Sequence, residues 1–393
     1  MCYVYSANIK TLLVIIVVFF GQTVVLPLLI ISSLVSRIIR KKNVSVGFGP
    51  EPINPFHSKS LSSLGIPSKS YITHKYYIGG DFDVDLSRSN AIFHLFDTLM
   101  FRSAFHALFN YNILFFYFHG GPIGFSSKAF WRLEWLILKL AGIKSVVMPY
   151  GGDVQDLRRN PNLLYKDALS IDYPSMWTRE RIVARKVNHW QRRADHVISG
   201  CDWVNYMSYW DTLCISHFAI DLSSINVVPR YRKENRLKVL HAPNHQAIKG
   251  TEALTRAIER LQSEGLEIEL TLIQKKPNSE VLKAIEECDL VVEQLVIGWY
   301  AQFAIEAMAY GKPVVSHIDR NLMSLYVSKE LLDEKEFPII SADCISIEET
   351  LRDFYYNSDS YQDRTSSGPE YVAKHHSLEA IGTLFSGIVE DLT

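Results

Sequence analysis

Apolar and polar positions alternate in blocks along this chain, after one long apolar run near the start. No residue from Thr11 to Ser36 is charged, and the apolar core of a bilayer needs only about 20 residues to be crossed. From residue 43 onwards, short apolar runs of strand length alternate with segments of helical spacing. This alternation predicts an α/β fold, with parallel sheets covered by helices.

The apolar run predicts an N-terminal transmembrane helix. Gly21, Gln22 and Pro27 interrupt the run, which favours a kinked span and leaves a re-entrant or interfacial segment as the alternative. A cleaved signal peptide fits less well, because the run is too long for one. One lysine precedes the run and four basic residues follow it: Arg37, Arg40, Lys41 and Lys42. This bias predicts a single-pass protein whose larger part lies on the cytoplasmic side of the membrane.

Composition excludes several classes of protein. The net charge of -1 argues against a nucleic-acid-coating protein, and 48% hydrophobic with 21% charged residues excludes intrinsic disorder. The five cysteines form no Cys-x-x-Cys pair, so a disulfide framework is not expected and a reducing compartment fits.

The strand and helix pattern divides the chain into four parts. We expect a membrane anchor over 1–42, a Rossmann-like domain over 43–230, and a second Rossmann-like domain over 231–375. A C-terminal helix over 376–393 is expected to pack back across them. Open parallel sheets bind ligands at the carboxyl ends of their strands, so a central cleft between the two domains is the expected site.

Two strand-to-helix turns in the second half carry residues suited to phosphate. The loop from Asn244 to Lys249 precedes a helix expected to begin near Gly250, and a helix N-terminus beside a lysine suits a diphosphate. Gly298-Trp299-Tyr300 opens a second helix, on which Glu306 could accept hydrogen bonds from a ribose. An ordinary solvated lysine and a surface glutamate are the alternatives when each residue is considered alone.

Residues 236–318 resemble the C-terminal domain of retaining, two-Rossmann (GT-B) glycosyltransferases of the family 4, "glycosyl transferases group 1" type. The resemblance rests on Lys249-Gly250, Asp289, Glu306-Ala307-Met308-Ala309, Gly311 and Pro313-Val314-Val315. It implies that Lys249 holds the donor diphosphate and that Glu306 holds the nucleotide ribose. It also implies that the backbone N–H groups of Trp299, Tyr300 and Ala301 bind the β-phosphate.

The chain departs from the family pattern at four places. Gln294-Leu295 stands where the family has Pro-Ser, and Trp299 and Ala301 stand where it has two turn glycines. Gly298 stands where the family has the first glutamate of its Glu-x7-Glu motif, and Glu293 lies five residues too early to replace it without a rearrangement. Asn244 or His245 stands where the family has an arginine.

The first half resembles the N-terminal domain of the same family more weakly. His119, at the end of an apolar strand, matches a family position near the donor sugar, although a strand-end histidine is more often structural. Asp153 follows a second strand and is a candidate acceptor-side base. The Asp83-Val-Asp85 pair fits a short acidic loop better than a metal site. We therefore expect neither a metal nor a cofactor besides the nucleotide-sugar substrate.

Together these features predict a membrane-anchored glycosyltransferase. It would move a sugar from a nucleotide-diphosphate donor to a glycan or a lipid-linked acceptor, with retention, in surface polysaccharide or glycoconjugate synthesis. Two alternatives stay open. One is a degenerate GT-B protein that binds nucleotide or glycan without transferring sugar, which is suggested by Gly298 in place of the first motif glutamate. The other is a sugar-nucleotide epimerase, which would need no anchor.

Overall fold

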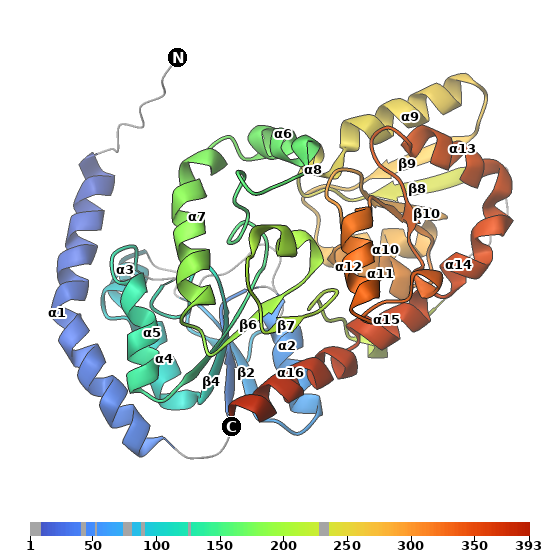
Figure 1. Ribbon diagram of the computed structural model, residues 1–393. Coiled ribbons are helices and arrows are strands. Elements are labelled where there is room, and N and C mark those ends of the chain that lie inside the picture. The colour runs from blue at the N-terminus through green and yellow to red at the C-terminus, as the bar shows by residue number, and fades with distance from the viewer. Residues whose placement is uncertain are drawn as a thin grey trace. The chain divides into compact units, whose positions relative to one another are not determined.

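The chain folds into two compact units, shown in a computed structural model (Figure 1). The structure describes residues 9–40, 45–51, 53–73, 81–87, 91–124, 127–227 and 236–393. Unit 1 comprises Met1–Asp153, Arg185–Val197 and Phe385–Thr393, and unit 2 comprises Val154–Ala184 and Ile198–Leu384. The domain boundaries expected at residues 42, 230 and 375 stay predictions.

A seven-stranded parallel sheet begins in unit 1, with strand order β3-β2-β1-β4-β5-β6-β7. In its centre, Phe115 of β4 lies opposite Phe48 of β1 on one side and Val146 of β5 on the other. All five residues of β4 are buried, as expected for a strand covered on both faces. The strands are β1 Val46–Phe48, β2 Ser68–Ile72, β3 Val84–Asp85, β4 Ile113–Tyr117, β5 Lys144–Met148, β6 His196–Ser199 and β7 Thr212–Leu213.

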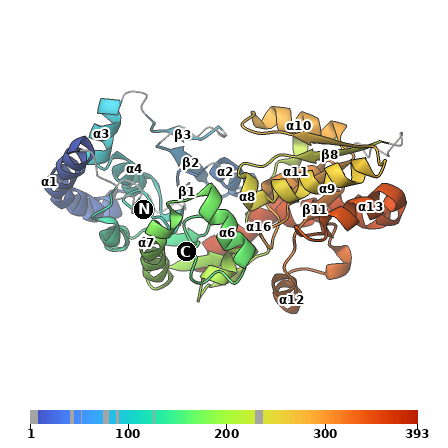
Figure 2. The same ribbon diagram turned by 90° about the horizontal axis from the view of Figure 1, so that it is seen from above.

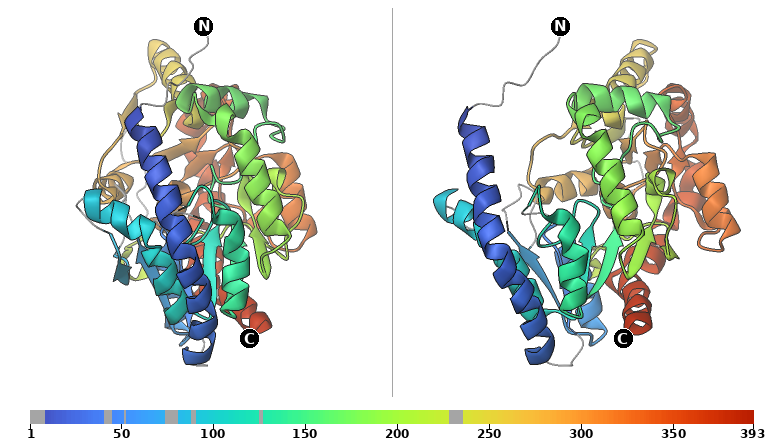
Figure 3. Two further views of the ribbon diagram at one scale, coloured as in Figure 1. Left: turned by 90° about the vertical axis from the view of Figure 1, so that its left-hand side faces the viewer. Right: turned by 60° about the vertical axis from the view of Figure 1, so that its left-hand side comes forward.

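The long apolar helix α1 is part of unit 1. This helix, α1, packs against α3, α4 and α5 (Figure 3). The ring of Phe385, from the C-terminal helix α16, packs against Phe48 and Phe115. The helices of unit 1 are α1 Ile9–Ile39, α2 Asn54–Ser63, α3 Ala91–Leu99, α4 Arg102–Asn110 and α5 Glu134–Leu140. Two further helices, α7 Met176–Gln191 and α16 Leu378–Leu392, begin in unit 2 and end in unit 1.

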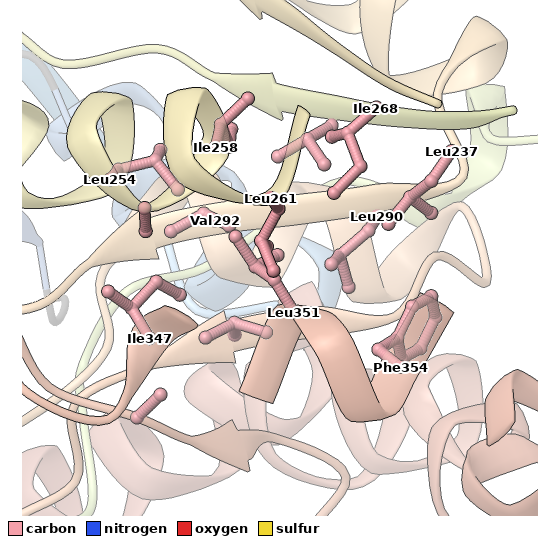
Figure 4. Packing of buried hydrophobic residues seen from close by; sticks show 14 of the residues in the cluster. Leu237, Leu254, Ile258, Leu261, Ile268, Leu290, Val292, Ile347, Leu351 and Phe354 are labelled. Atoms are coloured by element: carbon pink, nitrogen blue, oxygen red, sulfur yellow. The ribbon is translucent and has the colours of Figure 1, made fainter. Parts of the chain in front are cut away.

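Unit 2 holds a five-stranded parallel sheet of order β12-β11-β10-β8-β9. Leu254, Ile258 and Leu261 lie on one face of α9 and belong to the same buried cluster as Leu290 and Val292 of β10 (Figure 4). This packing holds α9 against the sheet, and the short helix α8 comes between β8 and α9 in the chain (Figure 2). The strands are β8 Leu237–His241, β9 Ile268–Leu272, β10 Leu290–Gln294, β11 Val314–Ser316 and β12 Ile340–Ser341.

The helices of unit 2 are mostly short and amphipathic. They are α6 Leu163–Asp172, α8 Gln246–Lys249, α9 Thr251–Ser263, α10 Asn278–Glu287, α11 Gln302–Ala309, α12 Arg320–Ser328, α13 Ile347–Asn357, α14 Gln362–Ser366 and α15 Gly368–His376. The two parallel sheets confirm the α/β class expected from the sequence.

One predicted helix is much shorter in the structure. The apolar spacing over 126–142 predicts one continuous helix, but α5 begins only at Glu134, after a 3-10 turn over Trp131–Leu133. The Glu134 carboxylate accepts hydrogen bonds from the backbone N–H groups of Gly121, Ile123 and Gly124. The start of α5 therefore serves to hold the loop after β4, a role that apolar spacing does not reveal.

Candidate functional site

The loop after β8 positions Lys249 at the end of the short helix α8. Gly250 follows with φ at +73°, and a Cβ atom there would lie 2.8 Å from Cβ of Leu295. Glycine is therefore required on both conformational and steric grounds. The Lys249 Nζ atom lies 3.3 Å from Glu293 Oε1 and 3.3 Å from Gln294 Oε1. The side chain is 17% exposed, so Lys249 is neither a free surface lysine nor fully buried.

The turn from β10 to α11 is anchored by two aromatic side chains. Trp299 and Tyr300 are both buried. The Trp299 Nε1–H donates to the Ile215 carbonyl at 3.0 Å, and the Tyr300 hydroxyl lies 2.9 Å from His376 Nε2. These two side chains therefore hold the turn in place.

Glu293 connects the two turns. Its side chain is fully buried, and the backbone N–H of Ala301 donates to both of its carboxylate oxygens at 3.0 Å. The same carboxylate pairs with Lys249. The ammonium of Lys249 and the N-terminus of α11 therefore converge on one anion, and in this structure that anion is a side chain of the protein itself.

Glu306 lies in the second turn of α11 and is almost completely buried. Burial raises the pKa of its carboxyl to about 7. The Asn278 side chain, at the start of α10, donates a hydrogen bond to Glu306 Oε1 at 3.3 Å. Glu306 is thus not an ordinary surface glutamate, and Asn278 is a neighbouring polar group that the sequence did not single out.

Gly298 cannot accept a side chain without movement of its neighbours. A Cβ atom there would lie 2.7 Å from Cβ of Asp319. We expect Gly298→Glu, which recreates the family motif, to destabilise the fold by about 1–3 kcal/mol and to leave nucleotide binding unimproved. Thermal unfolding and nucleotide titration would test this. Gly387→Ala is the matched control, because a Cβ atom there meets nothing within 4 Å; equal stability of the two variants would contradict the prediction.

Asn244 and His245, the proposed replacements for the family arginine, differ in their surroundings. Asn244 is exposed. His245 Nε2 lies 2.5 Å from the Tyr173 hydroxyl, and the two rings pack at 4.6 Å. Helix α6 also contacts α8, because the Asp172 carboxylate at the end of α6 accepts a hydrogen bond from the Ile248 N–H at 2.8 Å. The α6 helix thus braces the Lys249 loop, which the sequence does not predict.

In unit 1, three loops at the carboxyl edge of adjacent strands carry a second polar group. His119 follows β4, Asp153 follows β5, and Glu51 follows β1. His119 Nε2 lies 3.2 Å from Glu51 Oε1. Burial and then Lys186 lower the pKa of His119 to about 4, and burial and then Asp153 raise the pKa of Glu51 to about 8. At pH 7 the pair is therefore a hydrogen bond between two neutral groups.

Asp153 is engaged mainly with backbone. Its Oδ1 accepts the N–H groups of Tyr150 and Gly151, and its Oδ2 accepts the N–H of Phe118, all at 2.9 Å. Burial raises its pKa to about 6. These bonds fix the loops after β4 and β5, so in this structure Asp153 acts as a positioning residue. Its candidacy as a base stays a prediction.

The buried Glu51 carboxyl makes stability depend on pH. The unfolded carboxyl releases its proton near pH 4.5, whereas the folded one keeps it until about pH 8. Stability is therefore lost as the pH rises through this window. We expect Glu51→Gln to remove about 2–4 kcal/mol of that loss between pH 5 and pH 8. Denaturant unfolding at both pH values tests this, and parallel pH profiles for wild type and variant would contradict it.

The structure brings the predicted site residues together in two groups. Lys249 and Ala301 meet around Glu293, and Gly250 lies against Leu295 beside them in the chain. His119 lies beside Glu51 with Asp153 close by. Sequence reasoning did not single out Glu51 within its loop, did not consider Asn278, and set Glu293 aside. Over the described parts of the chain, no three His, Cys, Asp or Glu side chains lie together as metal ligands would.

No protein-family model matches the chain, and no curated protein matches it in sequence. Among solved structures, sucrose-phosphate synthase from Thermosynechococcus elongatus matches with a TM-score of 0.58 over 89% of this chain and 99% of that chain, at 13% identity. Two further matches reach TM-scores of only 0.47, which is too low to support a conclusion. They are starch synthase IV from Arabidopsis thaliana (90% of this chain, 99% of that chain, 10% identity) and TarM from S. aureus (70% of this chain, 55% of that chain, 13% identity). The chain thus has a fold of the GT-B glycosyltransferase type.

Proposed function

We propose that this protein is a glycosyltransferase that takes its sugar from a nucleotide-diphosphate donor bound in unit 2. In this proposal Lys249 binds the diphosphate, the N-terminus of α11 binds the terminal phosphate, and Glu306 binds the ribose. The transferred sugar leaves a diphosphate behind, so the contribution of Lys249 is to neutralise charge that develops on the leaving group.

The observation that carries the proposal is the convergence of Lys249 Nζ and the Ala301 N–H on one carboxylate. A phosphate presents oxygens with a similar spread and a greater charge, so a phosphate could bind the same two donors. Glu293 would have to turn away, or share the site as a protonated acid, for this to happen.

The same carboxylate supports a second candidate function. A buried anion at the phosphate position, together with Gly298 in place of the motif glutamate, favours a degenerate protein that binds nucleotide or glycan without transferring sugar. Donor turnover separates the two candidates: binding with release of the nucleoside diphosphate supports a transferase, whereas binding without release supports the degenerate protein.

We propose that unit 1 binds the acceptor, and that His119 and Glu51 belong to its acceptor site. The acceptor is a glycan or a lipid-linked sugar, and the resemblance of residues 236–318 to family 4 suggests retention of configuration. The apolar helix α1 attaches the protein to the membrane, with both units on the cytoplasmic side, because the basic residues that follow α1 are attracted to the anionic cytoplasmic leaflet.

The proposal is tested by isothermal titration of the full-length chain in detergent with UDP, GDP, ADP and their sugars. The full chain is needed because one face of α1 is buried against unit 1. Selective binding of one nucleotide type with micromolar affinity would support the proposal. Absence of binding by every nucleotide, in a protein that unfolds cooperatively, would overturn it.

A further inference from the structure

One face of α1 carries a stripe of buried positions at intervals of three, four and seven residues. Such spacing places residues on one side of a helix. The buried members are Gln22, Leu29, Ser33 and Ser36, and Val18, Gly21, Val25, Leu26, Ser32 and Arg40 are partly buried on the same side. This stripe is notably polar for a helix of such high hydropathy.

Helix α1 is part of unit 1, and its buried stripe is held by specific polar contacts with the rest of that unit. Gln22 donates to the Thr98 carbonyl at 3.2 Å and accepts from the Ser127 hydroxyl at 2.7 Å. At the other end, the Arg40 guanidinium donates to the carbonyls of Leu108 and Ala141 at 2.8 and 2.7 Å.

These contacts extend along most of the helix. The ring of Phe19 stacks on Phe130, with centroids 5.6 Å apart, and the contacts continue to Arg40. At 1.5 Å per residue, this length is about 30 Å, which equals the thickness of a bilayer core. Figure 3 shows α1 lying lengthwise beside the helices of unit 1.

A helix docked in this way cannot also cross a bilayer. If α1 spanned the membrane, α3, α4 and α5 would be drawn into the hydrocarbon with it. These helices carry charged residues such as Arg102, Glu134 and Lys139, and each charge near the bilayer centre costs about 2.5–3.5 kcal/mol or more. Docking on unit 1 and spanning are therefore mutually exclusive arrangements of α1.

The opposite face of α1 is apolar and exposed. Phe20, Val24, Ile31 and Ile38 are 64%, 78%, 58% and 85% exposed. On the neighbouring α3, Ile92 and Phe96 stand one turn apart and are 76% and 56% exposed. Only 11% of the most apolar window of Val14–Ile39 is buried, and its mean hydropathy is 2.8. A core helix of a soluble protein would be mostly buried.

We propose that α1 lies in the plane of the membrane interface instead of crossing the bilayer. Its polar stripe binds unit 1, while its apolar face and the tip of α3 enter one leaflet to a depth of about 5–10 Å. The occupant of this surface is an anionic phospholipid leaflet. Arg37, which is exposed, and the Lys41-Lys42 pair that follows in the sequence complement its charge. This inference does not depend on the proposed transferase activity.

Labelling of Cys2 in sealed membrane vesicles tests the proposal. The reference is a second cysteine, Ser263→Cys, at the exposed end of α9, in a full-length chain that also carries Cys344→Ser. With a membrane-impermeant maleimide, an in-plane α1 predicts that both cysteines react from the same side of the vesicle. Reaction from opposite sides would overturn the proposal. A mature chain that lacks residue 2, or a chain found only in the soluble fraction, would also overturn it.

A matched pair of variants tests the docking face separately. Gln22→Leu removes the buried amide, and Thr23→Leu makes a similar apolar change on the adjacent exposed position. We expect Gln22→Leu to lower the melting temperature of the detergent-solubilised protein by several degrees and Thr23→Leu to leave it unchanged. Equal melting temperatures for the two variants would contradict the docked arrangement.

Discussion

Replacing Lys249 with alanine is expected to weaken the binding of a nucleoside diphosphate ten- to a hundredfold. The change removes one charge-assisted contact, worth about 1.5–3 kcal/mol. If the protein is a transferase, turnover should fall further, by about 10²–10³, because the same ammonium would stabilise the departing diphosphate. Isothermal titration and an assay for nucleoside-diphosphate release measure the two effects.

The control for this variant must separate loss of binding from loss of fold. Removal of Lys249 leaves the buried Glu293 carboxylate without its ammonium partner, which costs stability. Lys249→Gln keeps a hydrogen-bond donor near Glu293, and Lys276→Ala removes a lysine from an exposed pair with Glu280 in the same unit. Equal nucleotide affinities for Lys249→Ala and Lys276→Ala would contradict the role given to Lys249.

Neutralising Glu293 is expected to strengthen nucleotide binding about tenfold or more. In the wild-type protein this carboxylate occupies the position between Lys249 and the Ala301 N–H. A diphosphate must displace it or bind beside a like charge. Glu293→Gln removes the charge and retains an oxygen that can accept the Ala301 N–H, so the start of α11 should be preserved. Titration of the same nucleotide against both proteins measures the gain.

Glu280→Gln is the matched control for Glu293→Gln, since it removes one negative charge from an exposed pair in the same unit. The expected gain should therefore be absent in Glu280→Gln. Affinity that is unchanged or weaker in Glu293→Gln would mean that the carboxylate supports the ligand, and the idea of a competing internal anion would be wrong.

The sequence predicts those parts of the site that depend on local order along the chain. The Lys249-Gly250 pair directly precedes a helix, and the structure starts α9 at Thr251. The helix expected to open at Gly298-Trp299-Tyr300 begins later, at Gln302, and these three residues form the turn before α11. Both features follow from a strand, a short loop and a helix, and neighbouring residues suffice to define them.

The sequence does not predict contacts between residues far apart along the chain. Glu293 lies 44 positions from Lys249. In the sequence it is an ordinary polar residue near the end of an apolar strand. Its role depends on the turn that follows, which brings the Ala301 N–H to its carboxylate. Glu51 is likewise not identified as a site residue from the sequence, because only the pairing of β1 with β4 brings it beside His119. In each case parallel strand pairing, which spacing alone does not specify, creates the cluster.

The N-terminal helix carries two sequence patterns at once. Gln22, Ser33 and Ser36 recur on one helical face, which is a pattern of docking. The uncharged run from Thr11 to Ser36 favours a transmembrane helix, because length and hydropathy are the criteria for spanning, and this stays a prediction. Only the contacts with Thr98 and Ser127 reveal that this polar face has partners.

The most direct test of the proposed function is a crystal structure of the full-length protein with the nucleoside diphosphate that binds most tightly. We predict that the terminal phosphate lies within hydrogen-bond distance of both Lys249 Nζ and the Ala301 N–H, with the Glu293 carboxylate displaced from them. A ribose hydroxyl should lie against Glu306. A nucleotide bound elsewhere in the protein, with the contacts of Glu293 intact, would contradict the proposed donor site.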